Sequence, residues 1–128
     1  ALYAVSVRDL IGYMQIRPMI DMGPPPNVPN LMDCSTSHTW YYKSAKAPDP
    51  NGRGYDGWGN TDTLLAHGRS VLRAQVKLAD AAFYFDPDHV ITLVGDGRGV
   101  SHGSWPGPYL VGMDYRGAPR SFRTFAVR

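Results

Sequence analysis

The feature that most constrains the fold is a hairpin signal in the second half of the chain. Residues 89–94 form an apolar run rich in β-branched side chains, residues 99–102 form a shorter run, and Asp96-Gly97 lies between them. An Asp-Gly pair between two such runs favours a tight turn that joins antiparallel strands. The sequence therefore predicts a β-hairpin here, within an antiparallel sheet.

The hairpin also predicts where two histidines point. If Asp96 and Gly97 are the two turn residues, Ile91 pairs with His102. Side chains two residues apart along a strand share a face of the sheet, so His89 and His102 become diagonal neighbours, roughly 7 Å apart at their backbones. A turn of odd length would change this, because a one-residue slip moves every side chain to the opposite face.

The remaining pattern predicts helices first and strands after. Apolar residues recur at helical spacing near the N-terminus, and a proline-rich run at residues 23–30 cannot be helical and must end before the next helix. This order is typical of an α+β domain with about five antiparallel strands. We expect helices over residues 3–17, from residue 33 or 34 onward, and from residue 61 or 62 to 68, and strands over residues 81–85, 89–94, 99–102, 110–113 and 121–127.

The only cysteine, Cys34, lies where the second helix is expected to begin. A thiolate is a far better nucleophile than a hydroxyl, and the free amides and positive dipole of a helix N-terminus stabilise both a thiolate and an oxyanion. With Cys34 as nucleophile, His89 as base and His102 orienting His89, the chain could cleave amides through a thioester. If Cys34 and His89 form an ion pair, thiol alkylation should proceed well below the pH at which a free thiol reacts.

Composition narrows the class of function. The chain has 128 residues, of which 43% are hydrophobic and 12% aromatic, which is enough for one globular domain with its own core. A formal charge of +2 with scattered basic residues gives weak support for a nucleic-acid partner. No apolar run approaches the roughly 20 residues of a membrane span, and no export signal is visible. We therefore expect a monomer without nucleic-acid or membrane partners, to which further domains could adjoin.

Four segments, in this order, resemble the NlpC-type cell-wall peptidases, which are papain-like cysteine hydrolases of peptidoglycan. The segments are Asp33-Cys34-Ser35, residues 79–85, residues 89–97 and Val100-Ser101-His102. The resemblance implies a papain-like fold, with Cys34 as nucleophile, His89 as base, His102 as the third member and no cofactor. It also implies that Asp33 and Ser35 contact the amine or the peptide backbone of the substrate, and that the Cys34 amide contributes to the oxyanion hole.

The same resemblance implies a substrate. The family cuts the stem peptide of peptidoglycan, most often at the bond joining D-glutamate to a diamino acid. Residues 101–108 and the glycine-rich middle loop are similar to peptidase modules of actinobacteriophage endolysins, which implies an antimicrobial lysis protein made in the host cytoplasm and acting at the wall. Two alternatives stay open: an N-acetylmuramoyl-L-alanine amidase with the same chemistry, and a catalytically inactive wall-binding module.

The chain departs from the family before the proline-rich loop. Residues 18–23 stand where the family commonly has a tyrosine and a Trp-Gly-Gly run, so Tyr13, Tyr55 or Trp58 is a candidate for the missing aromatic wall. Tyr55 and Trp58 interrupt a glycine-rich loop of the kind that often borders a binding cleft. His38, one helical turn after Cys34, suggests a metal ligand, but zinc normally needs at least three protein ligands, so we expect no metal.

Overall fold

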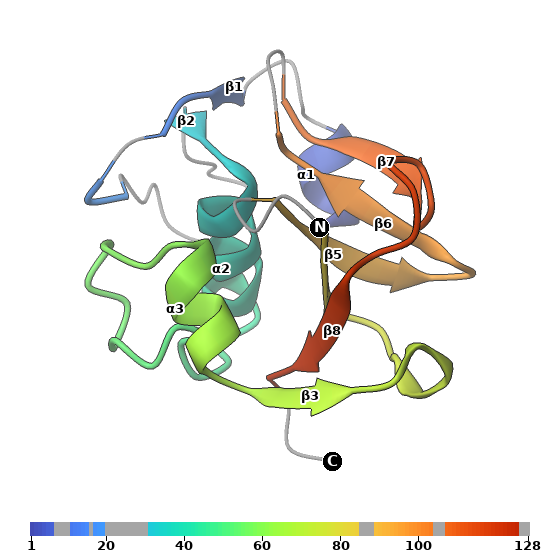
Figure 1. Cartoon of the computed structure of the whole chain (residues 1–128). Coiled ribbons are helices and arrows are strands. Elements are labelled where there is room, and N and C mark those ends of the chain that lie inside the picture. Colours follow the sequence, from blue (N-terminus) through green and yellow to red (C-terminus); the bar gives the residue numbers. More distant parts are fainter. Residues whose placement is uncertain (7–10, 16, 20–30, 85–88, 104–106, 126–128) are drawn as a thin grey trace.

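A computed structural model describes residues 1–6, 11–15, 17–19, 31–84, 89–103 and 107–125 (Figure 1). The elements are α1 (Leu2–Ser6), β1 (Gly12–Tyr13), β2 (Leu31–Met32), α2 (Cys34–Ser44), α3 (Thr61–Ala66), β3 (Arg69–Val71), the 3₁₀ helix η2 (Arg73–Gln75), β4 (Ala81–Phe83), β5 (Val90–Gly95), β6 (Arg98–Ser101), β7 (Tyr109–Gly112) and β8 (Ser121–Thr124).

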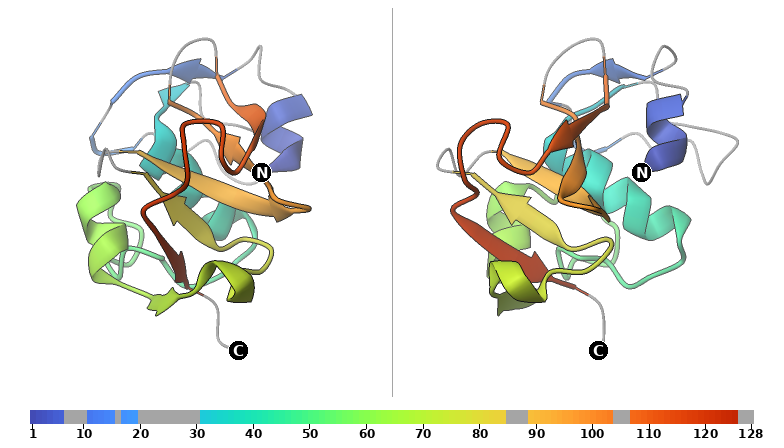
Figure 2. Two further views of the ribbon diagram at one scale, coloured as in Figure 1. Left: turned by 45° about the vertical axis from the view of Figure 1, so that its right-hand side comes forward. Right: turned by 90° about the vertical axis from the view of Figure 1, so that its right-hand side faces the viewer.

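The core of the fold is an antiparallel sheet of six strands in the order β3-β8-β4-β5-β6-β7. Helix α2 lies against β5 and also contacts α3, and Figure 2 shows this arrangement from two further sides. The predicted α+β class and antiparallel sheet are confirmed, with one strand more than expected. The additional strand is β3, which pairs with β8 and is mostly exposed, so it has no apolar run that would predict it.

The predicted helix over residues 3–17 is wrong. Helix α1 ends at Ser6, and β1 instead pairs in parallel with β2, which brings Gly12 beside Leu31. Ala4 of α1 and Ile11, which precedes β1, are nevertheless buried in one core cluster. Residues 7–10 and 16, like the proline-rich run at residues 23–30, lie outside the described part of the chain.

Helix α2 begins where the sequence predicts, because Asp33 caps it. The Asp33 carboxylate accepts a hydrogen bond of 3.0 Å from the Thr36 amide, and the Thr36 hydroxyl accepts one of 2.8 Å from the Asp33 amide. This reciprocal capping box satisfies two backbone donors and makes Cys34 the first residue of the helix. Helix α3 is capped in the same way by Asn60 and begins at Thr61, within the predicted range.

The central strands β4 and β5 are buried on both faces of the sheet, because successive side chains point to opposite faces. Phe83 and Val90 face α2 and α3, whereas Ile91, Leu93 and Phe122 pack together on the opposite face. No helix in the described residues has both the length and the apolar character required to cross a bilayer.

The β5–β6 hairpin has the predicted turn but not the predicted register. Asp96 and Gly97 both have positive φ, at 57° and 68°, and Gly95 pairs with Arg98 as expected. A bulge between Leu93 and Gly95 then adds one residue to β5, so that Ile91 pairs with Ser101 instead of His102. The slip places Ser101 on the face of His89 and turns His102 toward the opposite face.

Candidate active site

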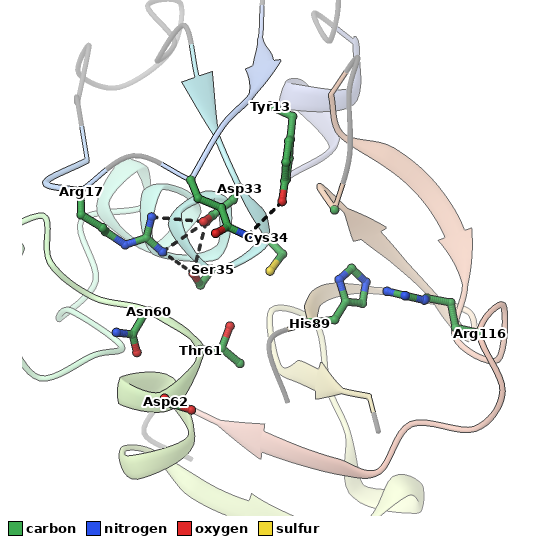
Figure 3. Close-up of a pocket in the computed structure, with 12 residues that line it drawn as sticks. Tyr13, Arg17, Asp33, Cys34, Ser35, Asn60, Thr61, Asp62, His89 and Arg116 are labelled. Carbon is green, nitrogen blue, oxygen red and sulfur yellow. Dashed lines mark hydrogen bonds and ion pairs between the residues drawn. The ribbon is translucent and has the colours of Figure 1, made fainter. Parts of the chain in front are cut away.

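A polar pocket of about 570 Å³ opens where the start of α2, the start of α3 and the residue before β5 meet (Figure 3). The pocket brings together four residues that the sequence predicts for the site, Cys34, His89, Asp33 and Ser35. Its other lining residues are Tyr13, Gln15, Arg17, Asn60, Thr61, Asp62, Gly103 and Arg116.

Cys34 is partly buried in the wall of this pocket. Burial and the neighbouring Asp33 carboxylate raise the pKa of the thiol to about 11, against the smaller opposing effect of hydrogen bonds from the Val90 backbone, the Thr61 side chain and the Ser35 backbone. Val90 directly follows His89 and begins β5. Its hydrogen bond therefore places the start of β5 next to the Cys34 sulfur. With this pKa a free thiol is mostly neutral at pH 7 and requires a base to react.

Asp33→Asn is expected to lower the pKa of the Cys34 thiol. The substitution removes a negative charge that disfavours the thiolate, while Asn caps a helix as well as Asp does. The pH dependence of iodoacetamide alkylation measures this: wild-type reactivity should rise toward about pH 11, and the Asp33→Asn curve should lie at lower pH. Asp62→Asn, which neutralises another carboxylate of the pocket, is the matched control and should leave the curve in place. Coincident curves for wild type and Asp33→Asn would contradict the assignment.

Arg17 is a site residue that the sequence analysis missed. Its guanidinium forms an ion pair of 3.1 Å with Asp33, donates a hydrogen bond of 3.0 Å to the Ser35 hydroxyl and donates one of 2.8 Å to the Gly59 carbonyl. The oxygens that the family resemblance assigns to the substrate are therefore engaged within the chain. The residues around Arg17 carry no signal for this role, because Arg17 falls at the end of a predicted helix that does not form.

His89 has two hydroxyl partners that were also missed. Its Nε2 lies 2.6 Å from the Tyr115 hydroxyl and 3.4 Å from the Ser101 hydroxyl, and these two oxygens are 2.9 Å apart. The rings of Tyr84 and His89 are in contact at a centroid separation of 5.4 Å. Ser101 comes to this position through the bulge in β5, and Tyr115 comes from the segment that follows β7.

His102 does not occupy the predicted place behind His89. Because the register has slipped by one residue, His102 faces α2, where its Nδ1 lies 2.6 Å from the Ser37 hydroxyl. The side chain is 1% exposed, and it is not among the described residues that line the pocket. The predicted sheet face shared by His89 and His102 is therefore wrong, whereas a role of His102 at the site stays a prediction.

Tyr55 and Trp58, the predicted aromatic wall, do not line the pocket. Their loop folds around Asp49, whose carboxylate accepts a hydrogen bond of 2.9 Å from the Tyr55 amide. The Tyr55 hydroxyl donates to the Ala47 carbonyl at 2.5 Å, which holds the ring near the end of α2. Trp58 is 52% exposed on the same loop. Of the three candidate aromatics, only Tyr13 reaches the pocket.

His38 is a buried core residue. Its Nδ1 lies 2.6 Å from the Thr92 hydroxyl, and its ring packs against Tyr42 and Phe125. Burial lowers its pKa to about 3, so the imidazole is neutral. Within the described residues, no cluster of three potential ligands could hold a metal ion.

Comparisons with known proteins find similarity in structure rather than in sequence. No protein-family model matches the chain, and no curated protein matches it. The NlpC/p60 domain of the peptidoglycan hydrolase SagA superposes with a TM-score of 0.63 at 18% identity, over 96% of this chain and 94% of that one. NlpC2 from Trichomonas vaginalis superposes with a TM-score of 0.67 at 17% identity, over 97% of this chain and 44% of the other.

The peptidoglycan hydrolase RipB from Mycobacterium tuberculosis superposes with a TM-score of 0.61 at 16% identity, over 98% of this chain. This chain spans 65% of the RipB chain. The superpositions extend over nearly all of the chain, so the sheet and the helices that cover it are shared with these structures. The chain therefore has the papain-like fold of NlpC/p60 domains.

Proposed function

We propose that this chain is a cysteine peptidase that hydrolyses amide bonds in the stem peptide of peptidoglycan. The observation that carries the proposal is that Cys34, at the start of α2, and His89, before β5, line one polar pocket in a fold shared with peptidoglycan hydrolases. In Figure 3 the Cys34 thiol and the His89 ring both reach into this pocket. A nucleophile and a base converging on a cleft are the minimum requirement for acyl transfer.

The proposed reaction uses His89 first as a base and then as an acid. His89 takes the thiol proton as the Cys34 sulfur attacks the scissile carbonyl, and backbone amides at the start of α2 stabilise the resulting oxyanion. The C–N bond then breaks, His89 gives its proton to the leaving amine, and a thioester remains on Cys34. Water, deprotonated by His89, hydrolyses the thioester and restores the thiol. A base is essential here, since the raised pKa of Cys34 keeps the free thiol neutral.

For the scissile bond we propose the link between D-glutamate and a diamino acid. The pocket suits a charged, polar peptide, because Asp62 lies on its α3 side and Arg116 beside His89 (Figure 3). An arginine fork can bind a carboxylate with two hydrogen bonds, and stem peptides of this kind carry free carboxylates. Arg17 is already paired with Asp33, which leaves Arg116 as our candidate for the substrate anion.

The biological setting that we propose is lysis of the bacterial cell wall by a phage-derived enzyme. The support is the likeness of residues 101–108 and of the glycine-rich loop to endolysin peptidase modules. In this setting the protein is made in the host cytoplasm and acts on the wall.

The test is a digest of purified peptidoglycan followed by mass spectrometry of the soluble fragments. The endopeptidase that we propose releases fragments cut inside the stem peptide, after D-glutamate. An amidase instead frees intact stem peptides from the sugar, and that product would overturn the assigned bond. Unchanged walls, in a digest where a known hydrolase is active, would overturn the enzymatic function and favour a wall-binding module.

A further inference from the structure

We propose that Tyr115, together with Ser101, positions His89 for its role as a base, in the place that the family resemblance gives to His102. The kinetic part of this inference rests on the proposed function. The geometric part does not, because it concerns which hydrogen bond fixes the tautomer and orientation of one imidazole. Tyr115 is a positioning residue in this proposal and does not touch the reacting atoms.

The ring of His89 stands between two cavities. One is the pocket that also contains Cys34, and the other, of about 390 Å³, is lined by Ser101 and Tyr115. His89 borders both, and its Nε2 is the atom that meets the Tyr115 hydroxyl, at 2.6 Å. In this proposal Nδ1 is the nitrogen that reacts with the thiol.

The hydrogen bonds around Nε2 agree with one direction of donation. A base that works through Nδ1 must carry its proton on Nε2, so Nε2–H donates to the Tyr115 oxygen. The Tyr115 hydroxyl then donates to the Ser101 oxygen at 2.9 Å, and each of these hydroxyls donates only once. An imidazolium would keep the same arrangement, since the Tyr115 oxygen accepts from Nε2–H in both charge states. The interaction therefore holds His89 through both halves of the reaction.

Tyr84 packs against Tyr115 and helps to hold it in place. Tyr84 packs edge-on against the Tyr115 ring at 5.5 Å and donates its own hydroxyl to the Met113 carbonyl at 2.7 Å. The charged and titratable residues that line the two cavities with His89 are Tyr13, Arg17, Asp33, Cys34, Asp62, Tyr109, Tyr115 and Arg116, and Tyr84 contacts its ring. Burial keeps the pKa of Tyr84 above its usual value, so that this neighbour stays neutral.

The decisive measurement is the tautomer of His89, read from the ¹⁵N NMR spectrum of the ring. The chain has four histidines, and the signals that disappear in His89→Gln identify those of residue 89. Wild type should show the Nε2–H form, and Tyr115→Phe should show a mixture of both forms. His102→Asn, whose amide can still meet the Ser37 hydroxyl, should retain the wild-type spectrum of His89.

The kinetic measurement separates positioning from a merely structural role. Tyr115→Phe should lower kcat about tenfold with little change in KM, and should move the acidic limb of the pH profile to lower pH, because an imidazolium loses its acceptor. A His89 tautomer that is unchanged in Tyr115→Phe would overturn the proposal, whatever His102→Asn does. Because NMR needs no substrate, a protein that proves inactive on cell walls would defeat the proposed function and still leave this inference open to test.

Discussion

Cys34→Ala is expected to abolish the release of peptides from peptidoglycan, with a loss of at least about 10³-fold. The thiol is the only atom in the pocket that can form the thioester, since Cys34 is the only cysteine of the chain. The pocket and the helix N-terminus remain in the variant, so binding to the wall should persist. Chromatography of soluble fragments measures the loss, and a pull-down on insoluble walls measures the retained binding.

Cys34→Ser is the matched variant for this result. Ser has the shape of Cys but a far less acidic hydroxyl, so the variant should fold normally and retain at most a trace of activity. Because Asp33 and not Cys34 caps α2, both variants should unfold within a few degrees of the wild-type temperature. Clearing of cell walls by Cys34→Ala at the wild-type rate would exclude the thiol mechanism.

The sequence predicted well those features that depend on neighbouring residues. The start of α2 follows from Asp33 and Thr36, which are three positions apart and satisfy each other. The Asp96-Gly97 turn likewise follows from two adjacent residues that tolerate positive φ. Cys34 and His89 could therefore be placed at the ends of the two elements that carry them into one pocket.

The features that the sequence did not predict depend on contacts between distant segments. The bulge before Gly95 carries no composition signal of its own, yet it decides that Ser101 and not His102 shares a face with His89. Arg17 pairs with a residue 16 positions away, and Tyr115 meets His89 across 26 positions. The pKa of the Cys34 thiol also depends on such contacts. Burial of the thiol in the pocket wall raises this pKa by more than the expected stabilisation of the thiolate at a helix N-terminus would lower it.

His89→Gln is expected to lower activity by about 10³-fold to 10⁴-fold near neutral pH, and to change the shape of the pH profile. With a pKa of about 11, only about one thiol in 10⁴ is ionised at pH 7, so without a base the reaction depends on this small fraction. The activity of the variant should then rise about tenfold for each pH unit up to about pH 11, whereas that of wild type should not. The amide of Gln can still meet the Tyr115 hydroxyl, which limits structural damage.

His67→Gln supplies the control for this prediction, because His67 is exposed at the end of α3 and does not line the pocket. The measurement is the initial rate on a soluble stem peptide, taken over short times so that alkaline unfolding does not contribute. A flat profile for His89→Gln, parallel to that of wild type, would mean that another group removes the thiol proton. A steep alkaline rise confined to His89→Gln would instead show that His89 makes a buried, weakly acidic thiol reactive at neutral pH.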